Sequence, residues 1–549
     1  MVQSPQSVDV LIIGAGAAGL SAALAAHEAG ATVAVIEKAD KLGGTAAISG
    51  GIVWMPQNAW MADAGMSDSR DEAIAYFEGL NHGDIDPARL GAFVDEGPAA
   101  LSFLAQLGAY EPVLLDAYPD YYLDRDGAKP DGGRALDNAM FSFKELGDWA
   151  DKIYDGGTTP RMMLKETPLG GASGYIAPDI MAQREADDMR AWGQALIGRL
   201  LKACLDRDIQ PKLKASVDSI IIENGMAKGA VIDGDELRAA RGVVLATGGF
   251  EWNKELTQTF LRGPMTSPAS PPGNTGDGLT LAMAAGAALG NMTSAWWMTT
   301  VEVPGDVWPE LSGTSGKQRA LPVLLERTLP HTVMVNRAGQ RFCNEAQNYS
   351  ALAGAFQTFN PNTYDYDNLP AYLVFDQNFR DKYPLASLMP GMPTPNWLTS
   401  AETPQELAAK IGVDGAGLAA TLAEFNGFAA SGTDEAFGRG AGDYDRFYGD
   451  RSRPGSAATL GALDKPPYYA VEIKIGALGT NGGAKTDPGA RVCAVQGGFI
   501  EGLYAAGNVM AGVTGSVYAG AGGTLGPALT FGVVAGRNAA THTIAAKVA

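Results

Sequence analysis

One tyrosine, Tyr518, interrupts a run of glycine, alanine and other small residues, GNVMAGVTGSVYAGAGGTLGPALTFG, at positions 507–532. The apolar segment after it predicts a helix, with Pro527 near the first helical position. A helix N-terminus favours negative charge. We expect the Tyr518 hydroxyl and a backbone amide such as that of Gly522 to point at one oxygen atom and to stabilise negative charge there. A tyrosine that only packs in the core is the alternative.

A dinucleotide-binding pattern opens the chain. Residues 8–37, VDVLIIGAGAAGLSAALAAHEAGATVAVIE, predict a strand, a glycine turn, a helix and a second strand. Gly14, Gly16 and Gly19 match GxGxxG, which permits a tight turn, close approach of backbone to a pyrophosphate, and close packing of helix on strand. Glu37 stands near the ~20-residue offset expected of a carboxylate that binds a ribose hydroxyl. A βαβ unit without a ligand is the alternative.

Further glycine turns favour FAD over NAD. KADKLGGTAAISGGIVWMP follows Glu37 directly, and the apolar strands in RGVVLATGGFE and GLYAAGNVMAG also end in glycine. Successive glycine turns at one crevice suit a long, flat cofactor, and GNTGDGLTLAMAAGAALG is a further FAD loop in this interpretation. The predicted FAD contacts are Gly14, Gly16, Ala17, Ala18, Gly19, Glu37, Lys38, Gly43, Gly44, Thr45, Ser49, Gly50, Gly51, Val217, Ala246, Thr247, Gly248, Asp277, Gly507, Asn508, Gly523, Thr524 and Leu525.

The order of these segments predicts an α/β fold in which one sheet is assembled from distant parts of the chain. We expect residues 1–302 and 480–549 to form a Rossmann-like FAD-binding domain, interrupted by an α+β substrate or catalytic domain at 303–479. The insert is richer in proline and aromatic residues, which is consistent with a cap over an apolar substrate.

Composition excludes several other functions. With 46% hydrophobic and 19% charged residues the chain is globular, and its formal charge of -20 argues against nucleic acid as a partner. Three distant cysteines and four histidines offer no metal-ligand spacing. The N-terminus MVQSPQSVDV lacks the features of a signal peptide, and no apolar run reaches ~20 residues, so a cytoplasmic location is expected.

Taken together, the segments resemble the fumarate reductase and succinate dehydrogenase flavoprotein superfamily, and within it the 3-ketosteroid Δ1-dehydrogenases. GGTAAISGGIVWMPQN and GQRFCNEAQNYS are shared broadly by the superfamily, whereas the PDYY segment and VYAGAG-TLGPALTFG are more specific to the ketosteroid branch. The segment 151–195 departs from the family pattern. Its methionines, Met162, Met163 and Met181, either pack or form a substrate-entry or membrane-surface flap, so peripheral membrane contact stays open.

The resemblance implies a catalytic set. Tyr518 and Gly522 would polarise the ketone of a steroid-like substrate, and Tyr349 would remove a proton from the carbon beside it while the flavin takes a hydride from the next carbon. A free phenol has a pKa of about 10, so a supporting hydroxyl is needed. That helper is Tyr121 or Tyr122, of which alternation along an extended segment allows one to face the site; Tyr122 is favoured.

Two absences narrow the activity. The segment IGALGTNGGAKTD contains no histidine, whereas the fumarate reductases share a dicarboxylate-binding histidine at this place. Residues 45–51, where the covalent-flavin members have a histidine, also contain none, so noncovalent FAD is expected. The alternatives that remain are a ketosteroid Δ4-dehydrogenase, an enone reductase or dehydrogenase on another cyclic ketone, and a flavin-binding protein without turnover. The electron acceptor, a quinone or another compound, stays open.

Overall fold

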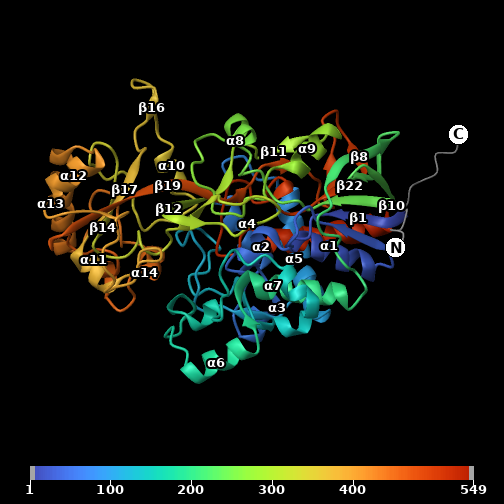
Figure 1. Cartoon of the computed structure of the whole chain (residues 1–549), viewed down its shortest axis with the longest axis horizontal. Helices are drawn as coiled ribbons and strands as arrows, with labels where there is room; N and C mark the ends of the chain where they lie inside the picture. The colour runs from blue at the N-terminus through green and yellow to red at the C-terminus, as the bar shows by residue number, and fades with distance from the viewer. Residues whose placement is uncertain (1–6, 543–549) are drawn as a thin grey trace.

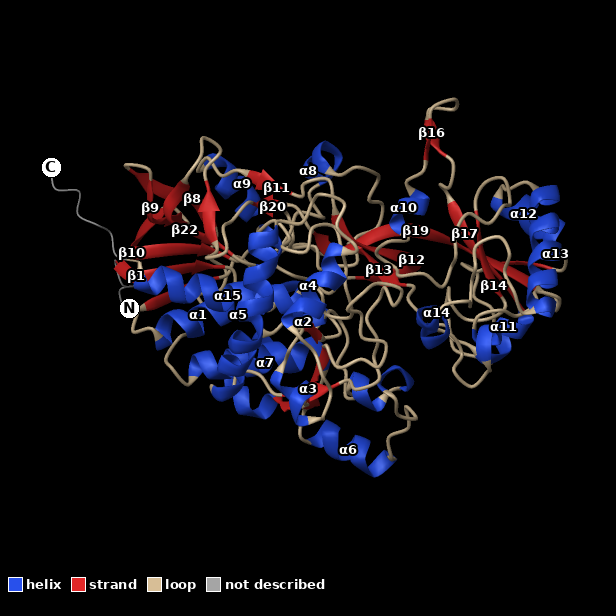
Figure 2. Ribbon diagram, turned by 180° about the vertical axis from the view of Figure 1, so that it is seen from behind, coloured by secondary structure: helices blue, strands red, loops and turns tan. Residues whose placement is uncertain are grey.

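The computed structural model describes residues 7–542; residues 1–6, where most of the expected leaderless N-terminus falls, lie outside the described part. The molecule is elongated, with one sheet near each end (Figures 1 and 2). Its α-helices are α1 (Ala17–Glu28), α2 (Gly44–Ile48), α3 (Ala59–Asp63), α4 (Arg70–Glu78), α5 (Pro87–Gln106), α6 (Pro178–Ala186), α7 (Trp192–Leu205), α8 (Lys254–Phe260), α9 (Asp277–Ala284), α10 (Ala353–Phe356), α11 (Gln377–Lys382), α12 (Pro404–Ile411), α13 (Gly415–Ser431), α14 (Asp443–Tyr448) and α15 (Leu525–Thr541).

The first sheet gathers strands from the start, middle and end of the chain. Its central strands β2, β1, β10 and β22 pair in parallel in that order, and β9, β8 and β21 add antiparallel pairings at its far side. The strands are β1 (Ser7–Ile13), β2 (Val33–Ile36), β8 (Val217–Glu223), β9 (Met226–Ile232), β10 (Asp235–Leu245), β21 (Arg491–Cys493) and β22 (Phe499–Ala505). The expected α/β fold, with a sheet built from distant segments, is confirmed.

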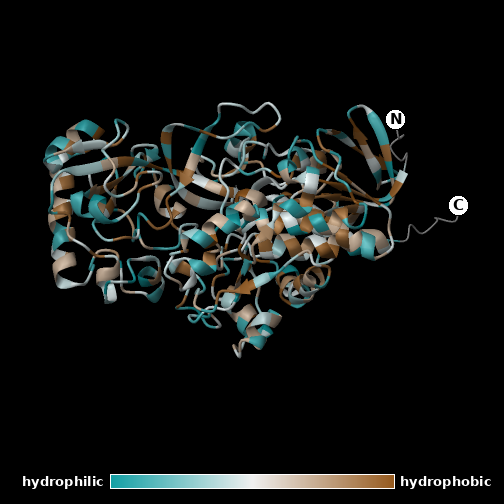
Figure 3. Cartoon of the chain, turned by 60° about the horizontal axis from the view of Figure 1, so that its bottom comes forward, coloured by the Kyte–Doolittle hydropathy of each residue, from teal (hydrophilic) through white to brown (hydrophobic). Residues whose placement is uncertain are grey.

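Small residues let two helices approach closely over this sheet. A Cβ added at Gly532 of α15 would lie 2.5 Å from the Ala18 carbonyl oxygen of α1, and one added at Gly536 would lie 2.1 Å from that of Ala22. The apolar helices around the first sheet appear brown over much of their length (Figure 3). This packing brings the N-terminus of α15 beside that of α1.

The second sheet is antiparallel and carries its own core. Its strands run in the order β13-β12-β19-β17-β14, with β18 beside β19, and α11, α12 and α13 lie at this end of the molecule (Figure 1). The strands are β12 (Ala295–Val307), β13 (Gln318–Pro322), β14 (Thr332–Val335), β17 (Ala371–Asp376), β18 (Thr399–Ala401) and β19 (Tyr468–Thr480). Because β12 and β19 cross the expected boundaries at 302/303 and 479/480, the domain division 1–302, 303–479 and 480–549 stays a prediction.

Shorter elements complete the chain between the two sheets. A three-stranded sheet contains β3 (Val53–Trp54), β5 (Ala135–Asn138) and β4 (Pro112–Leu114), and three pairs are β6 (Phe141–Ser142) with β7 (Met189–Arg190), β11 (Leu289–Gly290) with β20 (Gly483–Ala484), and β15 (Phe359–Asn360) with β16 (Asp365–Tyr366). The 3-10 helices are η1 (Phe143–Lys152), η2 (Leu164–Glu166), η3 (Pro168–Gly170), η4 (Gly455–Ala458) and η5 (Gly507–Val509). The segment 151–195 forms a protrusion that ends in α6 (Figure 1).

Candidate active site

The glycines of the first turn divide into two kinds. Gly14 has a φ of 109°, and a Cβ there would lie 2.3 Å from the Ala246 carbonyl oxygen; at Gly19 it would lie 1.9 Å from the carbonyl oxygen of Gly14. Gly16, the N-cap of α1, would meet only the Gly43 carbonyl oxygen, at 3.8 Å. The fold itself therefore requires two of the three glycines, while Gly16 leaves open space before the amides of Ala17 and Ala18, which suits a phosphate.

The acidic residue of the motif lies at the edge of the same crevice. Glu37 accepts hydrogen bonds from the amides of Ala15 and Ala39, both at 3.0 Å, and burial raises the pKa of its carboxyl group. The next residue, Lys38, donates to Asp277 Oδ2 at 2.6 Å and to Thr275 at 2.8 Å. The predicted FAD loop around Asp277 is thus brought to the end of β2, 239 positions away in the sequence.

The second glycine turn lies against the first. The Gly43 amide donates to the Ala15 carbonyl at 3.0 Å, and Gly44 and Thr45 begin α2. Thr45 accepts from Asn274 at 2.7 Å, and that amide also donates to the buried Glu251 at 2.6 Å. The remaining predicted contacts follow strand or helix ends: Ser49, Gly50 and Gly51 after α2, Ala246, Thr247 and Gly248 after β10, and Val217 at the start of β8.

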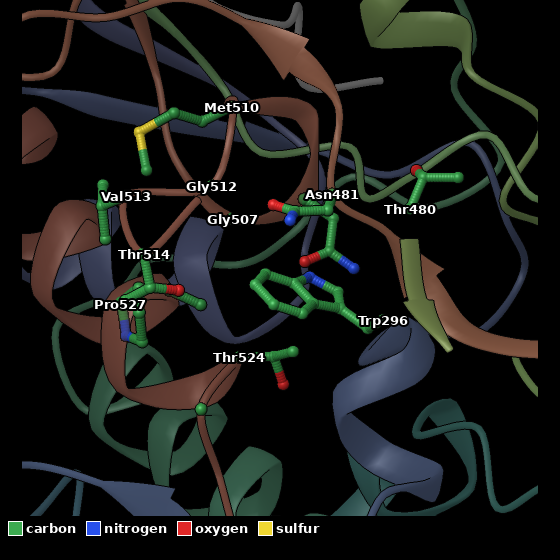
Figure 4. A pocket seen from close by; sticks show the side chains of 13 residues that line it. Trp296, Thr480, Asn481, Gly507, Met510, Gly512, Val513, Thr514, Thr524 and Pro527 are labelled. Atoms are coloured by element: carbon green, nitrogen blue, oxygen red, sulfur yellow. The ribbon is translucent and has the colours of Figure 1, made fainter. Parts of the chain in front are cut away.

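A narrow cleft lies between the segment that follows β22 and the start of α15 (Figure 4). Its lining includes five predicted or discussed positions, Gly507, Asn508, Gly523, Thr524 and Pro527, together with Trp296, Thr480, Asn481, Met510, Gly512, Val513, Thr514 and Ala528. Asn481 Oδ1, in this lining, is buried and has no hydrogen-bond partner among the described residues. A free polar atom, bare backbone and apolar walls in one cleft fit a flat cofactor with a polar edge.

Tyrosines cluster where the α15 loop meets the second sheet. Tyr518 stacks on Tyr121 with ring centroids 5.8 Å apart and meets Tyr349 edge-on at 5.4 Å. The hydroxyls of Tyr121 and Tyr349 lie 3.1 Å apart, and the Tyr518 hydroxyl is within hydrogen-bonding reach of Tyr349, Thr524 and the Gly522 amide. The structure therefore brings the predicted residues Tyr518, Tyr349, Tyr121 and Gly522 together.

Gly522 occupies a position that only glycine fits well. Its φ is 94°, and a Cβ would lie 2.4 Å from the Ile52 carbonyl oxygen. The Gly522 carbonyl accepts from the Trp54 amide at 3.2 Å and from the Gly526 amide at 3.1 Å. These bonds hold the peptide between Gly522 and Gly523 in place, next to the Gly522 amide that lies within reach of the Tyr518 hydroxyl.

Burial dominates the electrostatics of the cluster. It raises the pKa of Tyr349 well above that of a free phenol, and the neighbouring hydroxyls of Tyr121 and Tyr518 raise it further. Burial also raises the pKa of Tyr518, but hydrogen bonds from Tyr349, Thr524 and Gly522 oppose the rise. All the phenols are consequently neutral near pH 7 in the absence of substrate.

Separate contacts hold the tyrosines in place. Asn348 donates from its side chain to the Tyr518 carbonyl at 3.3 Å, which links the segment of Tyr349 to the α15 loop. The Tyr121 amide donates to the Ala519 carbonyl at 3.0 Å. Beside it, the buried Asp120 accepts from Trp54 Nε1 at 2.8 Å and Arg134 Nη1 at 2.9 Å. These contacts hold the backbone of Tyr121 and Tyr518 in place and so fix the positions of their rings.

The preference for Tyr122 as the inward-facing tyrosine is wrong. Tyr121 contacts Tyr349 and Tyr518, whereas Tyr122 lies half-buried at the edge of the cluster and makes no hydroxyl hydrogen bond or ring contact with either. Residues 118–123 form a loop, not a strand, and the bond from the Tyr121 amide to Ala519 sets which ring points inward. Alternation along a strand therefore does not apply.

Several site residues lack a clear signal in the sequence. Trp296 lines the cleft and meets Tyr518 edge-on at 5.5 Å, while Trp297 belongs to the core of the second sheet. Tyr444 and Tyr448, four positions apart on α14, pack on Tyr121 at 5.4 and 6.2 Å, and Tyr118 shares a 2.6 Å hydroxyl contact with Tyr448. The pair on α14 has helical spacing, but nothing local indicates its partners.

Two features that are absent from residues 7–542 bear on other functions. No group of three or more His, Cys, Asp or Glu side chains there is placed to hold a metal ion. None of the helices in that range has both the length and the apolar character needed to cross a bilayer.

Known proteins resemble this chain over nearly its full length. The FAD binding domain family matches residues 9–525. The 4-oxocyclohexanecarboxylate 2-dehydrogenase of Sinomonas cyclohexanicum is 38% identical, covering 98% of this chain and 94% of its own. The 3-oxosteroid 1-dehydrogenase of Mycobacterium tuberculosis (strain ATCC 25618 / H37Rv) is 37% identical, covering 96% and 98%. The crystal structure of 3-ketosteroid delta1-dehydrogenase from Sterolibacterium denitrificans, in complex with 1,4-androstadiene-3,17-dione, superposes with a TM-score of 0.89 at 35% identity, covering 98% of this chain and 100% of that one.

Proposed function

The chain belongs to the FAD binding domain family and to its branch of 3-ketosteroid Δ1-dehydrogenases, as an FAD-dependent oxidoreductase that acts on CH–CH groups, and from that premise we propose that it desaturates the 1,2-bond of 3-ketosteroids. The observation that carries the proposal is the convergence of Tyr518, Gly522 and the Tyr121–Tyr349 pair beside the cleft at the start of α15.

Two donors polarise the ketone in this proposal. The Tyr518 hydroxyl and the Gly522 amide both donate to the carbonyl oxygen, where charge develops as the neighbouring carbon loses its proton. Because the site is buried, water does not compete with these donors. The positive φ of Gly522 keeps its amide directed at that point without movement during the reaction.

Proton removal falls to Tyr349. In its phenolate form Tyr349 accepts the proton from the carbon beside the ketone and becomes a neutral phenol, and Tyr121, 3.1 Å away, donates to the phenolate oxygen before the transfer. FAD, when bound, supplies the acceptor for the hydride that leaves the neighbouring carbon. The predicted contacts from Gly14 to Leu525 hold it without a covalent bond, since no histidine stands at 45–51.

The proposal is tested by mixing the oxidised protein anaerobically with a 1,2-saturated 3-ketosteroid and following flavin absorbance. We expect rapid bleaching and formation of the 1,2-unsaturated product, with Tyr349→Phe slowing the bleaching by about 100-fold or more. A product unsaturated at the 4,5-bond would instead assign a Δ4-dehydrogenase, and oxidation of the reduced flavin by a 1,2-enone alone would assign an enone reductase. Unchanged bleaching by Tyr349→Phe would rule out its role as the base.

A second candidate is favoured by the similarity to a 4-oxocyclohexanecarboxylate 2-dehydrogenase at 38% identity. On this alternative the substrate is a single cyclohexanone ring that carries a carboxylate, and the same phenols act on it. The comparison of kcat/KM for 4-oxocyclohexanecarboxylate with that for a 3-ketosteroid separates the two, because each predicts the opposite order. The electron acceptor and the cytoplasmic location stay predictions from the sequence.

A further inference from the structure

A second cleft borders the loop that carries Tyr121. It has a volume of about 310 Å³ and lies between that loop and the segment that begins with α14. Its apolar lining consists of Pro119, Leu123, Pro130, Phe447 and Ala458, and its polar lining consists of Asp443, Arg446, Arg451 and Arg453. Hydrocarbon walls with cations at one side suit an apolar molecule that has one acidic end.

Two of the three arginines have no acidic partner. Arg446 is satisfied by Asp443 and by the carbonyls of Gly440 and Ala441. Arg451 donates only to the Pro168 carbonyl, at 2.7 Å, while its guanidinium lies 5.0 Å from the centre of the Phe447 ring. Within residues 7–542 no carboxylate forms an ion pair with Arg451 or Arg453, although the chain carries a formal charge of -20.

The contact of Arg453 leaves its charge available. Its Nη1 lies 3.3 Å from Nε2 of His331, whose Nδ1 lies 2.7 Å from the Ala462 carbonyl oxygen. A carbonyl only accepts, so Nδ1 carries the hydrogen and Nε2 accepts from the arginine. Burial also lowers the pKa of His331, which keeps the ring neutral. Arg453 is therefore oriented by a neutral group at this nitrogen, while Asp450, three positions earlier, acts on its charge without forming an ion pair.

The cleft borders two elements that carry tyrosines of the cluster. Pro119 and Leu123 flank Tyr121 in one loop, and Phe447 lies next to Tyr448 on α14. Ring contacts lead from Phe447 to Tyr448 at 5.3 Å, from Tyr448 to Tyr121 at 6.2 Å, and from Tyr121 to Tyr518 at 5.8 Å. The cleft therefore lies against the loop and the helix that position Tyr121.

We propose that Arg451 and Arg453 bind a carboxylate at the end of the substrate remote from its ketone, so that the preferred substrates are ketosteroids with an acidic side chain. This inference rests on the proposed function. The hydrocarbon skeleton lies along Phe447, Leu123 and Pro119, and the guanidinium groups give charge-assisted hydrogen bonds to the carboxylate. The interaction is remote from the reacting carbons, so it lowers KM and leaves kcat unchanged.

The test compares three substrates: a 3-ketosteroid with a side-chain carboxylate, its methyl ester, and a 3-ketosteroid without a side chain. For the wild type we expect the acid to have the highest kcat/KM. Arg451→Gln is expected to lower kcat/KM for the acid by about 10- to 100-fold through KM, with values for the two neutral ketones within about twofold. Arg451→Lys should recover part of the loss, because it keeps the charge but not the planar donor pair.

A control variant and a binding measurement distinguish loss of the carboxylate site from a general loss of activity. Arg238→Gln, which removes an exposed arginine of β10, is the matched control and should change none of the three values. Calorimetric binding of the acid's 1,2-unsaturated product, which needs no turnover, should weaken in Arg451→Gln by the same factor as KM. Equal losses for acid and ester, or a wild-type preference for the ester, would overturn the carboxylate site while the desaturase stands. No turnover of any ketosteroid would instead refute the proposed function.

Discussion

The hydroxyl oxygens of Tyr121 and Tyr349 lie 3.1 Å apart, although 228 positions separate the two residues in the chain. The contact joins the loop before β5 to the segment before α10, and Tyr518 packs on both rings. Either hydroxyl can donate, so once Tyr349 is ionised the Tyr121 hydroxyl is placed to donate to its phenolate oxygen. In the neutral protein both neighbouring hydroxyls and burial raise the pKa of Tyr349, so this donation offsets part of the cost of ionisation during the reaction.

The pair predicts different effects for neighbouring tyrosines. Tyr121→Phe removes the hydroxyl beside Tyr349 and should slow flavin reduction by about 10- to 100-fold, the contribution of one hydrogen bond to a charged group. Tyr122→Phe removes a hydroxyl that has no bond to Tyr349 and should change the rate by less than about threefold. Anaerobic stopped-flow measurements of both variants check this. The reverse order would return the helper role to Tyr122.

Removal of the Tyr518 hydroxyl tests the carbonyl site. Tyr518→Phe keeps the ring packing with Trp296 and Tyr121 but leaves the Gly522 amide as the sole donor. We expect flavin reduction to slow by about 100- to 1,000-fold, the usual loss for one oxyanion donor. Steroid affinity and flavin content should stay near wild type. Bleaching at the wild-type rate by this variant would contradict the carbonyl role.

The FAD-binding residues can be predicted from the sequence more completely than the residues of the substrate site. Gly14, Gly19 and Glu37 follow from local turn chemistry and strand ends, so their pattern alone indicates their use. The choice between Tyr121 and Tyr122 depends on a bond to Ala519, hundreds of positions away, and no local pattern contains it. Likewise, the cluster position of Tyr448 depends on how α14 packs against a loop from another part of the chain.

The two kinds of glycine in the first turn predict separable defects. Gly16→Ala adds a methyl group that meets only the Gly43 carbonyl, so the protein should fold yet hold FAD poorly. Gly19→Ala places a Cβ 1.9 Å from the Gly14 carbonyl oxygen and should prevent soluble expression or lower Tm strongly. Gly427→Ala, in an uncrowded stretch of α13, is the control and should retain full flavin. Flavin absorbance and circular dichroism of the three variants measure the two effects. Full flavin occupancy in Gly16→Ala would contradict the assigned phosphate position.

The raised pKa of Tyr349 fixes the direction of the pH dependence. Burial and the neighbouring phenols place that pKa above 10, so the phenolate is a small fraction that grows about tenfold for each pH unit below the pKa. If the phenolate is the base, the logarithm of the rate of flavin reduction at saturating ketone should rise with pH with a slope near one from pH 7 to pH 10, without a plateau.

Stopped-flow rates across this range, with circular dichroism to verify folding at each pH, give the profile. Tyr349→Phe should lose the slope together with the activity. A plateau below pH 9 would mean that the group that ionises is not this buried phenol. A phenol that ionises at such a pH needs a positive neighbour, whereas the side chains that act most strongly on Tyr349 are the neutral hydroxyls of Tyr121 and Tyr518.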